Sequence, residues 1–165
     1  MSKINSLSPD EAREQLGRCC GAARWVEAMV KRRPFRSADE LFEAADQIWY
    51  NLSPEDWREA FSHHPKIGDL ESLKRKFAST RQWSAGEQSG VDGAPEEVLG
   101  ALAAGNEEYE RKFGYIFIVC ATGKTATEML SLLQQRLVND PESEIQVAMR
   151  EQSKITRIRL EKLLS

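Results

Sequence analysis

The chain has only two histidines, His63 and His64, and they stand side by side directly before Pro65. Histidine titrates near neutral pH, so its ring can donate or accept a proton under physiological conditions. Proline disfavours helical backbone at the residue before it, and Gly68 permits a tight turn. His64 is therefore predicted at a corner between a helix and a loop, where its ring can face a cleft. The alternative is a structural role, because histidines also meet the last free carbonyls of a helix.

A second group of polar side chains comprises Ser84, Glu87 and Gln88. Residues three and four apart share one face of a helix, so a helix here places a hydroxyl, a carboxylate and an amide together. Such a face can hold a small polar ligand, whereas by spacing alone an exposed polar face is the simpler interpretation. The functional interpretation requires that this face lie close to His64.

Other signatures of chemistry are missing from the sequence. Residues 122–125 resemble the end of a phosphate-binding loop, but the position of its required first glycine is occupied by Ile118. The sequence contains no G-x-S-x-G, and no cysteine lies near a histidine, so a hydrolase nucleophile is not indicated. His63, His64 and Asp69 are metal-ligand types, yet neither H-E-x-x-H nor a Cys/His cluster accompanies them. No metal site is predicted.

Helices must position these residues, and helix-start signals recur along the chain. A capping serine followed by proline and acidic residues is typical of a helix N-terminus. Between the starts, apolar residues follow helical spacing, for example over residues 41–49 and 129–137. The sequence predicts an all-α fold of about seven or eight helices in a single compact domain over residues 1–165. The start signals lie at Ser8, Ser37, Ser53, Ala94 and Asp140.

Residues 115–121 break the helical pattern, because this short segment is aromatic and β-branched and glycines flank it. It would suit a buried strand, but no second strand is predicted to pair with it. Its backbone N–H and C=O groups must still be satisfied, by helix ends, water or a ligand. We expect either a hydrophobic plug between helices or a main-chain wall of a binding site.

Composition narrows the class of protein. With 165 residues and a net charge of −3, the chain lacks the basic excess of a general nucleic-acid binder. Its three cysteines, Cys19, Cys20 and Cys120, form no C-x-x-C pair, which favours a reducing compartment over a disulfide framework. No apolar run is long enough to span a bilayer, and no signal peptide is evident. We expect neither nucleic acid nor membrane as a partner.

Four segments are similar to OHCU decarboxylases, which act on 2-oxo-4-hydroxy-4-carboxy-5-ureidoimidazoline (OHCU), the last intermediate between urate and (S)-allantoin. Residues 61–69 resemble the family's H-P-x-I/L-x-G corner, and residues 83–88 resemble its S-x-x-E-Q motif. Residues 109–120 match an apolar run after a helix that ends in Tyr-x-x-x-Phe. Residues 151–160 resemble the final helix. The matches follow the family's order and span residues 54–164.

The resemblance implies an all-helical enzyme without a cofactor, in which His64 is catalytic and Glu87 is the carboxylate paired with it. His63 has no role in the family pattern. The corner lacks the alanine that many relatives carry before Gly68, which affects the loop and leaves the catalytic positions intact. The positions implied to bind substrate are Pro65, Ser84, Gln88, Phe117, Val119 and Arg159, with main-chain groups acting near Phe117 and Val119.

The substrate of this family explains why a cofactor is not expected. Its carboxylate and hydroxyl share a ring carbon beside a C=N bond, so the imine accepts the electrons left by CO₂. The protein must orient the substrate, move protons and stabilise charge, and we assign the proton transfers to His64 and Glu87. Arg159 would anchor an anionic or carbonyl oxygen.

Other functions are weighed beside this one, namely a helical binding module without activity and a hydrolase of a related small heterocycle. The chain ends in Leu163-Leu164-Ser165 without the peroxisomal S-K-L signal of eukaryotic relatives, so we expect a bacterial-style cytoplasmic enzyme. Its expected partner is a small ureidoimidazoline, and the sequence leaves open whether it is a monomer or a homodimer.

Overall fold

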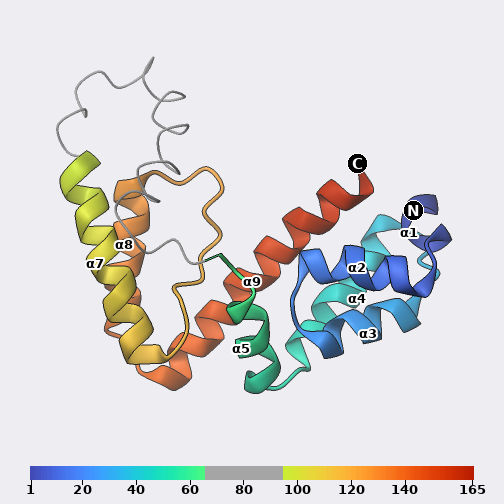
Figure 1. The fold of residues 1–165 in the computed structure, drawn as a ribbon, viewed down its shortest axis with the longest axis horizontal. Helices are drawn as coiled ribbons and strands as arrows, with labels where there is room; N and C mark the ends of the chain where they lie inside the picture. Colours follow the sequence, from blue (N-terminus) through green and yellow to red (C-terminus); the bar gives the residue numbers. More distant parts are fainter. Residues whose placement is uncertain (66–94) are drawn as a thin grey trace, which may run out of the picture. The chain divides into compact units, whose positions relative to one another are not determined.

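The computed structural model describes residues 1–65 and 95–165, and within these ranges it contains eight helices and no strand (Figure 1). The predicted all-α fold of about seven or eight helices is confirmed. The chain divides into two compact units. Unit 1 comprises Met1–His64, Ile118–Cys120 and Ile145–Ser165, and unit 2 comprises Pro65–Phe117 and Ala121–Glu144.

Side chains cap the N-termini of helices in unit 1. Ser8 and Ser53 each form a capping box, in which the serine oxygen accepts an N–H and the third helical residue, Glu11 or Asp56, accepts the serine's own N–H. Such caps contribute roughly 1 kcal/mol each. The helices of unit 1 are α1 (Ser2–Ser6), α2 (Pro9–Cys19), α3 (Ala23–Arg32), α4 (Ala38–Tyr50), α5 (Pro54–Ser62) and α9 (Pro141–Leu164) from Ile145 onward.

Three buried tryptophans join these helices. Trp25 donates its indole N–H to the carbonyl of Ala45 at 3.1 Å, which links α3 to α4. Trp57 donates to the carbonyl of Trp49 at 3.0 Å, linking α5 to α4. Trp49 in turn donates to the carbonyl of Met149 in α9 at 2.8 Å. A buried indole requires such a partner, so each tryptophan fixes a helix pair as well as filling the core.

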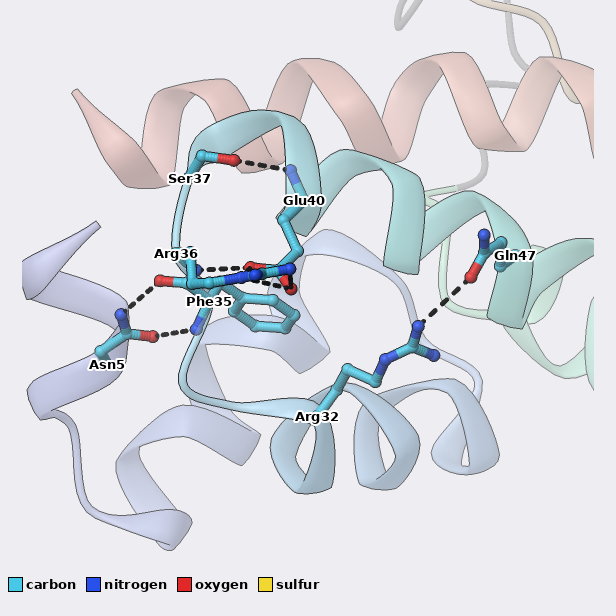
Figure 2. A network of polar contacts seen from close by, with 7 residues as sticks. All are labelled: Asn5, Arg32, Phe35, Arg36, Ser37, Glu40 and Gln47. Carbon is cyan, nitrogen blue, oxygen red and sulfur yellow. Dashed lines mark hydrogen bonds and ion pairs between the residues drawn. The ribbon is translucent and has the colours of Figure 1, made fainter.

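The connection between α3 and α4 is held by the N-terminal helix (Figure 2). The Asn5 side chain donates to the carbonyl of Phe35 at 2.8 Å and accepts from its N–H at 2.9 Å, so it pairs with both main-chain groups of this buried residue. Arg36 and Glu40 form an ion pair, and Ser37 caps α4 by accepting the N–H of Glu40 at 3.1 Å. The start of α4 is thereby fixed against α1.

Unit 2 contains α7 (Pro95–Phe113), α8 (Ala126–Leu137) and the first residues of α9. The two longer helices lie side by side (Figure 1). Gly105 allows this close approach, since a β-carbon there would come within 2.6 Å of a methyl carbon of Leu133. Thr125, like the serines of unit 1, caps its helix by accepting the N–H of Glu128.

A buried ion pair completes unit 2. Arg136 contacts Glu144 at 2.6 Å, and the side chain of Glu144 is 0% exposed. Tyr109 donates its hydroxyl hydrogen to the same carboxylate. Burial raises the pKa of Tyr109, and so does the hydrogen bond to Glu144, whereas the charge of Arg136 lowers it. The net effect is a raised pKa, so the phenol keeps its proton. The guanidinium carbon of Arg136 lies 4.5 Å from the centre of the Phe117 ring.

None of the helices in the two described ranges is long and apolar enough to cross a membrane.

Candidate active site

His64 lies just beyond the C-terminus of α5. The helix ends at Ser62, His63 is its C-cap, and the backbone N–H of His64 donates to the carbonyl of Phe61 at 3.2 Å. Pro65 follows and is exposed. The helix-to-loop corner predicted from the proline is therefore confirmed. The ring of His64 is half-buried, whereas the adjacent His63 is exposed.

The ring of His64 meets a polar side chain of α9. Its Nε2 atom is hydrogen-bonded to Oε1 of Gln152, a residue that is 0% exposed. Gln152 donates from its own nitrogen to the hydroxyl of Thr156 at 3.0 Å, and Thr156 is also buried. The partner of the His64 ring is thus a buried amide 88 residues away in sequence.

Arg159 extends the same face of α9. Residues 152, 156 and 159 are four and three apart, so their side chains line one side of the helix. Nη1 of Arg159 lies 3.5 Å from the carbonyl oxygens of Arg18 and Cys19, at the end of α2. These contacts hold a half-buried guanidinium near the His64 ring.

The electrostatics keep His64 neutral. Burial lowers the pKa of His64 below its ordinary value of 6.5, and the charges of Arg159 and His63 lower it further, while the hydrogen bond to Gln152 opposes them. Removing a cation from water and placing it near another cation both disfavour the protonated ring. A neutral imidazole at pH 7 can accept a proton during a reaction.

Cys19 and Cys20 lie beside this cluster as buried, unpaired thiols. Burial raises the pKa of Cys19 to about 11 and that of Cys20 to about 12. The nucleophilic form of cysteine is the thiolate, so neither side chain is set up for covalent catalysis at neutral pH. Their observed role is structural: both side chains are buried, and the Cys19 carbonyl contacts Nη1 of Arg159 at 3.5 Å.

Val119 belongs to the segment that sequence analysis could not pair. Residues 116–121 have no regular secondary structure, and Val119 is half-buried. The N–H of Cys120 donates at 3.2 Å to the carboxylate of Glu151 in α9, which Lys154 also contacts at 2.5 Å. A charged side chain therefore satisfies part of this backbone, a solution that the sequence interpretation did not include.

The structure places the remaining predicted residues as follows. Phe117 belongs to unit 2, where its ring packs edge-on against Tyr109 and under Arg136. Ser84, Glu87 and Gln88 lie outside the described residues. In unit 1 the His64 ring contacts Gln152 on the face of α9 that also carries Arg159, and Val119 belongs to the same unit. The substrate-binding and catalytic roles of all these residues stay predictions.

Gln152 and Thr156 were missed by sequence reasoning. The only signal available was position: Gln152 lies seven residues, about two helical turns, before Arg159 and so on the same face. A glutamine in a helix is ordinarily solvent-exposed, and nothing local marks this one as buried. Among the described residues, no group of three or more His, Cys, Asp or Glu side chains could hold a metal ion.

The chain is similar to known proteins in both sequence and structure. A family model described as OHCU decarboxylase matches residues 5–161. A crystal structure of OHCU decarboxylase in the presence of (S)-allantoin is similar with a TM-score of 0.72 and 36% identity, over 91% of this chain and 96% of that one.

Curated relatives agree with the family match. The chain is 38% identical over 148 residues to the uric acid degradation bifunctional protein TTL of Arabidopsis thaliana, which covers 89% of this chain and 45% of that protein. It is 27% identical over 165 residues to the 2-oxo-4-hydroxy-4-carboxy-5-ureidoimidazoline decarboxylase of Amia calva, covering 99% of this chain and 94% of that protein. The chain thus spans less than half of the plant protein and nearly all of the fish protein.

Proposed function

Because the chain belongs to the OHCU decarboxylase family, we propose that it catalyses the cofactor-free decarboxylation of OHCU to (S)-allantoin in urate degradation. The observation that carries the proposal is that the His64 ring is hydrogen-bonded to Gln152 on the face of α9 that also carries the cation of Arg159. A proton-transfer group beside an anion-binding group suits a substrate that carries a carboxylate.

The proposed reaction is balanced by protons alone. The bond between the ring carbon and the carboxylate breaks, and its electron pair forms a double bond to the adjacent carbon while the imine nitrogen takes a proton. The hydroxyl then loses its proton and becomes a carbonyl as a new C–H bond forms on the adjacent carbon. CO₂ is the only fragment lost, and proton delivery from one face yields a single enantiomer.

His64 and Glu87 share these proton transfers in our proposal. The lowered pKa of His64 supports a neutral ring that can accept the hydroxyl proton. General acid–base assistance of this kind contributes about 10²–10⁴-fold to a rate. Glu87 enters from the family resemblance, because it matches the carboxylate of the S-x-x-E-Q motif.

Arg159 is proposed to bind a carboxylate or carbonyl oxygen of the substrate. A guanidinium carries five N–H donors in a rigid fork. Only Nη1 of Arg159 is directed at the carbonyls of Arg18 and Cys19, at 3.5 Å. Those contacts orient the side chain, and none of the other described residues takes up its remaining donors, which can therefore serve a ligand. Main-chain groups near Phe117 and Val119 and the side chains of Ser84 and Gln88 would bind the rest of the heterocycle.

The same proposal covers the organisation and location of the protein. We propose that residues 1–165 form one OHCU decarboxylase-like domain, which the family match over residues 5–161 supports. We also propose a cytoplasmic location, which the free thiols of Cys19 and Cys20 support, since thiols persist in reducing compartments. The electron sink within the substrate supports catalysis without a cofactor.

The test is an assay in which OHCU is generated from urate in situ and optically active allantoin is followed by circular dichroism. The wild-type chain is compared with His64→Ala and with His63→Ala, a matched control that removes the neighbouring exposed ring. We expect rapid formation of (S)-allantoin by the wild type and by His63→Ala, and its loss in a still-folded His64→Ala.

The other outcomes separate the alternatives. A wild-type trace no faster than spontaneous decay to racemic allantoin would refute the decarboxylase proposal and favour a binding module. A ring-opened product formed without release of CO₂ would instead indicate a hydrolase. Thermal melting of each variant shows whether a loss of activity reflects a loss of fold.

A further inference from the structure

Gln152 joins His64 to the interior of unit 1. Its amide is fully buried in α9, with Oε1 on Nε2 of His64 and Nε2 on the hydroxyl of Thr156 at 3.0 Å. A buried amide must satisfy a donor end and an acceptor end, and the two ends are not interchangeable. The direction in which Gln152 lies therefore determines what the His64 ring can do.

Thr156 fixes that direction. Its hydroxyl oxygen accepts the N–H of Nε2 of Gln152 at 3.0 Å, inside the same helix. The nitrogen of the amide then faces Thr156, and the oxygen, which has no hydrogen, faces His64.

The consequence for His64 follows from the chemistry of imidazole. An amide oxygen only accepts, so Nε2 of His64 must carry the hydrogen in their bond. In a neutral ring the other nitrogen, Nδ1, then holds the lone pair. Burial and the charge of Arg159 disfavour a second proton on the ring, so the neutral form is the one that Gln152 orients.

We propose that Gln152 is a positioning residue that holds His64 as the Nε2–H tautomer, so that Nδ1 is the atom that exchanges protons with the ligand of this site. The inference rests on the proposed function only for the identity of that ligand. The donors run from His64 to Gln152 and from Gln152 to Thr156.

The first test reads the tautomer directly and needs no turnover. Two-bond ¹H–¹⁵N correlation spectra of the full chain labelled with ¹⁵N-histidine show which ring nitrogen carries hydrogen. The chain has only two histidines, so a His63→Gln variant assigns both ring patterns. We expect Nε2 of His64 to be protonated and Nδ1 unprotonated at pH 7.5. The reverse pattern would overturn the inference.

The second test uses variants at position 152. Gln152→Met removes the acceptor, whereas Gln152→Glu keeps an acceptor and makes it anionic. Gln146, exposed on the same helix, supplies the matched controls Gln146→Met and Gln146→Glu. We expect Gln152→Met to lower kcat at least about ten-fold with a small change in KM, as when a general base loses orientation but remains present.

Gln152→Glu should preserve the Nε2–H tautomer and recover part of the lost kcat. Its carboxylate also stabilises the imidazolium, so the acid limb of the pH–rate profile should move to higher pH. Among the described residues, the charged or titratable groups that act on His64 besides position 152 are Arg159 from α9 and His63 from its own segment, and neither is altered. Equal losses in both variants, with an unmoved pH profile and an unchanged tautomer, would show a purely structural role and overturn the inference.

The two proposals fail separately. If the wild-type chain does not decarboxylate OHCU but the spectra show Nε2–H, the proposed function falls and the positioning of His64 stands. If the assay succeeds and the spectra show Nδ1–H, the function stands and the role of Gln152 falls.

Discussion

Gly21 lies directly against the ring of His63. A β-carbon at position 21 would come within 2.6 Å of Cγ and Cδ2 of this ring and within 2.7 Å of its Cβ. Carbon atoms do not approach so closely, so the connection between α2 and α3 has room for the end of α5 only because position 21 is a glycine. The ring of His63, which has no catalytic role in our proposal, occupies the space that the missing side chain of Gly21 leaves.

We predict that Gly21→Ala displaces the end of α5 and lowers both stability and turnover. Overpacking of this kind costs about 1–3 kcal/mol. Urea unfolding and the allantoin assay measure the two effects. Gly17→Ala is the matched control, because a β-carbon at position 17 in α2 meets nothing within 4 Å.

A double-mutant cycle checks the cause of that loss. His63→Gly removes every side-chain atom that a β-carbon at position 21 would meet, so Gly21→Ala should cost much less in that background. If the cost is the same with and without the His63 side chain, the contact is not what requires the glycine.

The lowered pKa of His64 predicts a sign for the pH dependence of stability. Below the ordinary value of 6.5 the unfolded chain binds this proton more readily than the folded chain. Stability contributed by neutral His64 is therefore complete above 6.5 and falls as the pH decreases toward the folded-state pKa. Urea unfolding measures how much the free energy of unfolding falls between pH 7.5 and pH 5.5. This decrease should be smaller for His64→Gln than for His63→Gln, which retains His64. Equal losses in the two variants would contradict the assignment.

The buried ion pair of Arg136 and Glu144 in unit 2 predicts that a conservative substitution strongly lowers stability. Glu144→Gln removes the buried carboxylate that Arg136 contacts, and breaking such a pair costs about 3–5 kcal/mol. The exposed pair of Arg13 and Glu27 offers the comparison, and Glu27→Gln should have a much smaller effect on the midpoint of urea unfolding. A double substitution, Arg136→Met with Glu144→Leu, should recover much of the loss. Failure to recover would mean that Tyr109 or Phe117 depends on the charge itself.

The raised pKa values of Cys19 and Cys20 predict chemical inertness in the folded chain. At pH 8 a thiol with a pKa of about 11 is ionised in roughly one molecule in a thousand. We expect mass spectrometry to show little alkylation of either residue by iodoacetamide until urea unfolds the protein. Alkylation of the native chain at the rate of a free cysteine would show that the site around Arg159 opens to solvent.

Local chemistry made much of the fold predictable. Ser8 and Ser53 each accept a free N–H group in the first turn of a helix. Such a cap is formed within four consecutive residues, so the sequence alone indicates where a helix begins. The corner at His64 was predictable for the same reason, since Pro65 constrains the residue before it.

Contacts between distant residues were not predictable in this way. Gln152 lies 88 residues from His64, and a glutamine within a helix has the same local pattern whether it is buried or exposed. The carboxylate that satisfies the N–H of Cys120 comes from Glu151, 31 residues later. Both partners are polar residues on α9 that become part of the interior only when other segments pack against that helix.

Unit 1 is assembled from three separate stretches of the chain, so its folding cannot be completed until the last stretch has been synthesised. The five helices α1 to α5 emerge first, but the carbonyl that receives the Trp49 indole belongs to Met149, 100 residues later. At about 5–20 residues per second the ribosome needs about 5–20 s to supply it. During that interval the face that will receive α9 is uncovered, so nascent chains are most exposed to aggregation and chaperone capture before their last helix arrives.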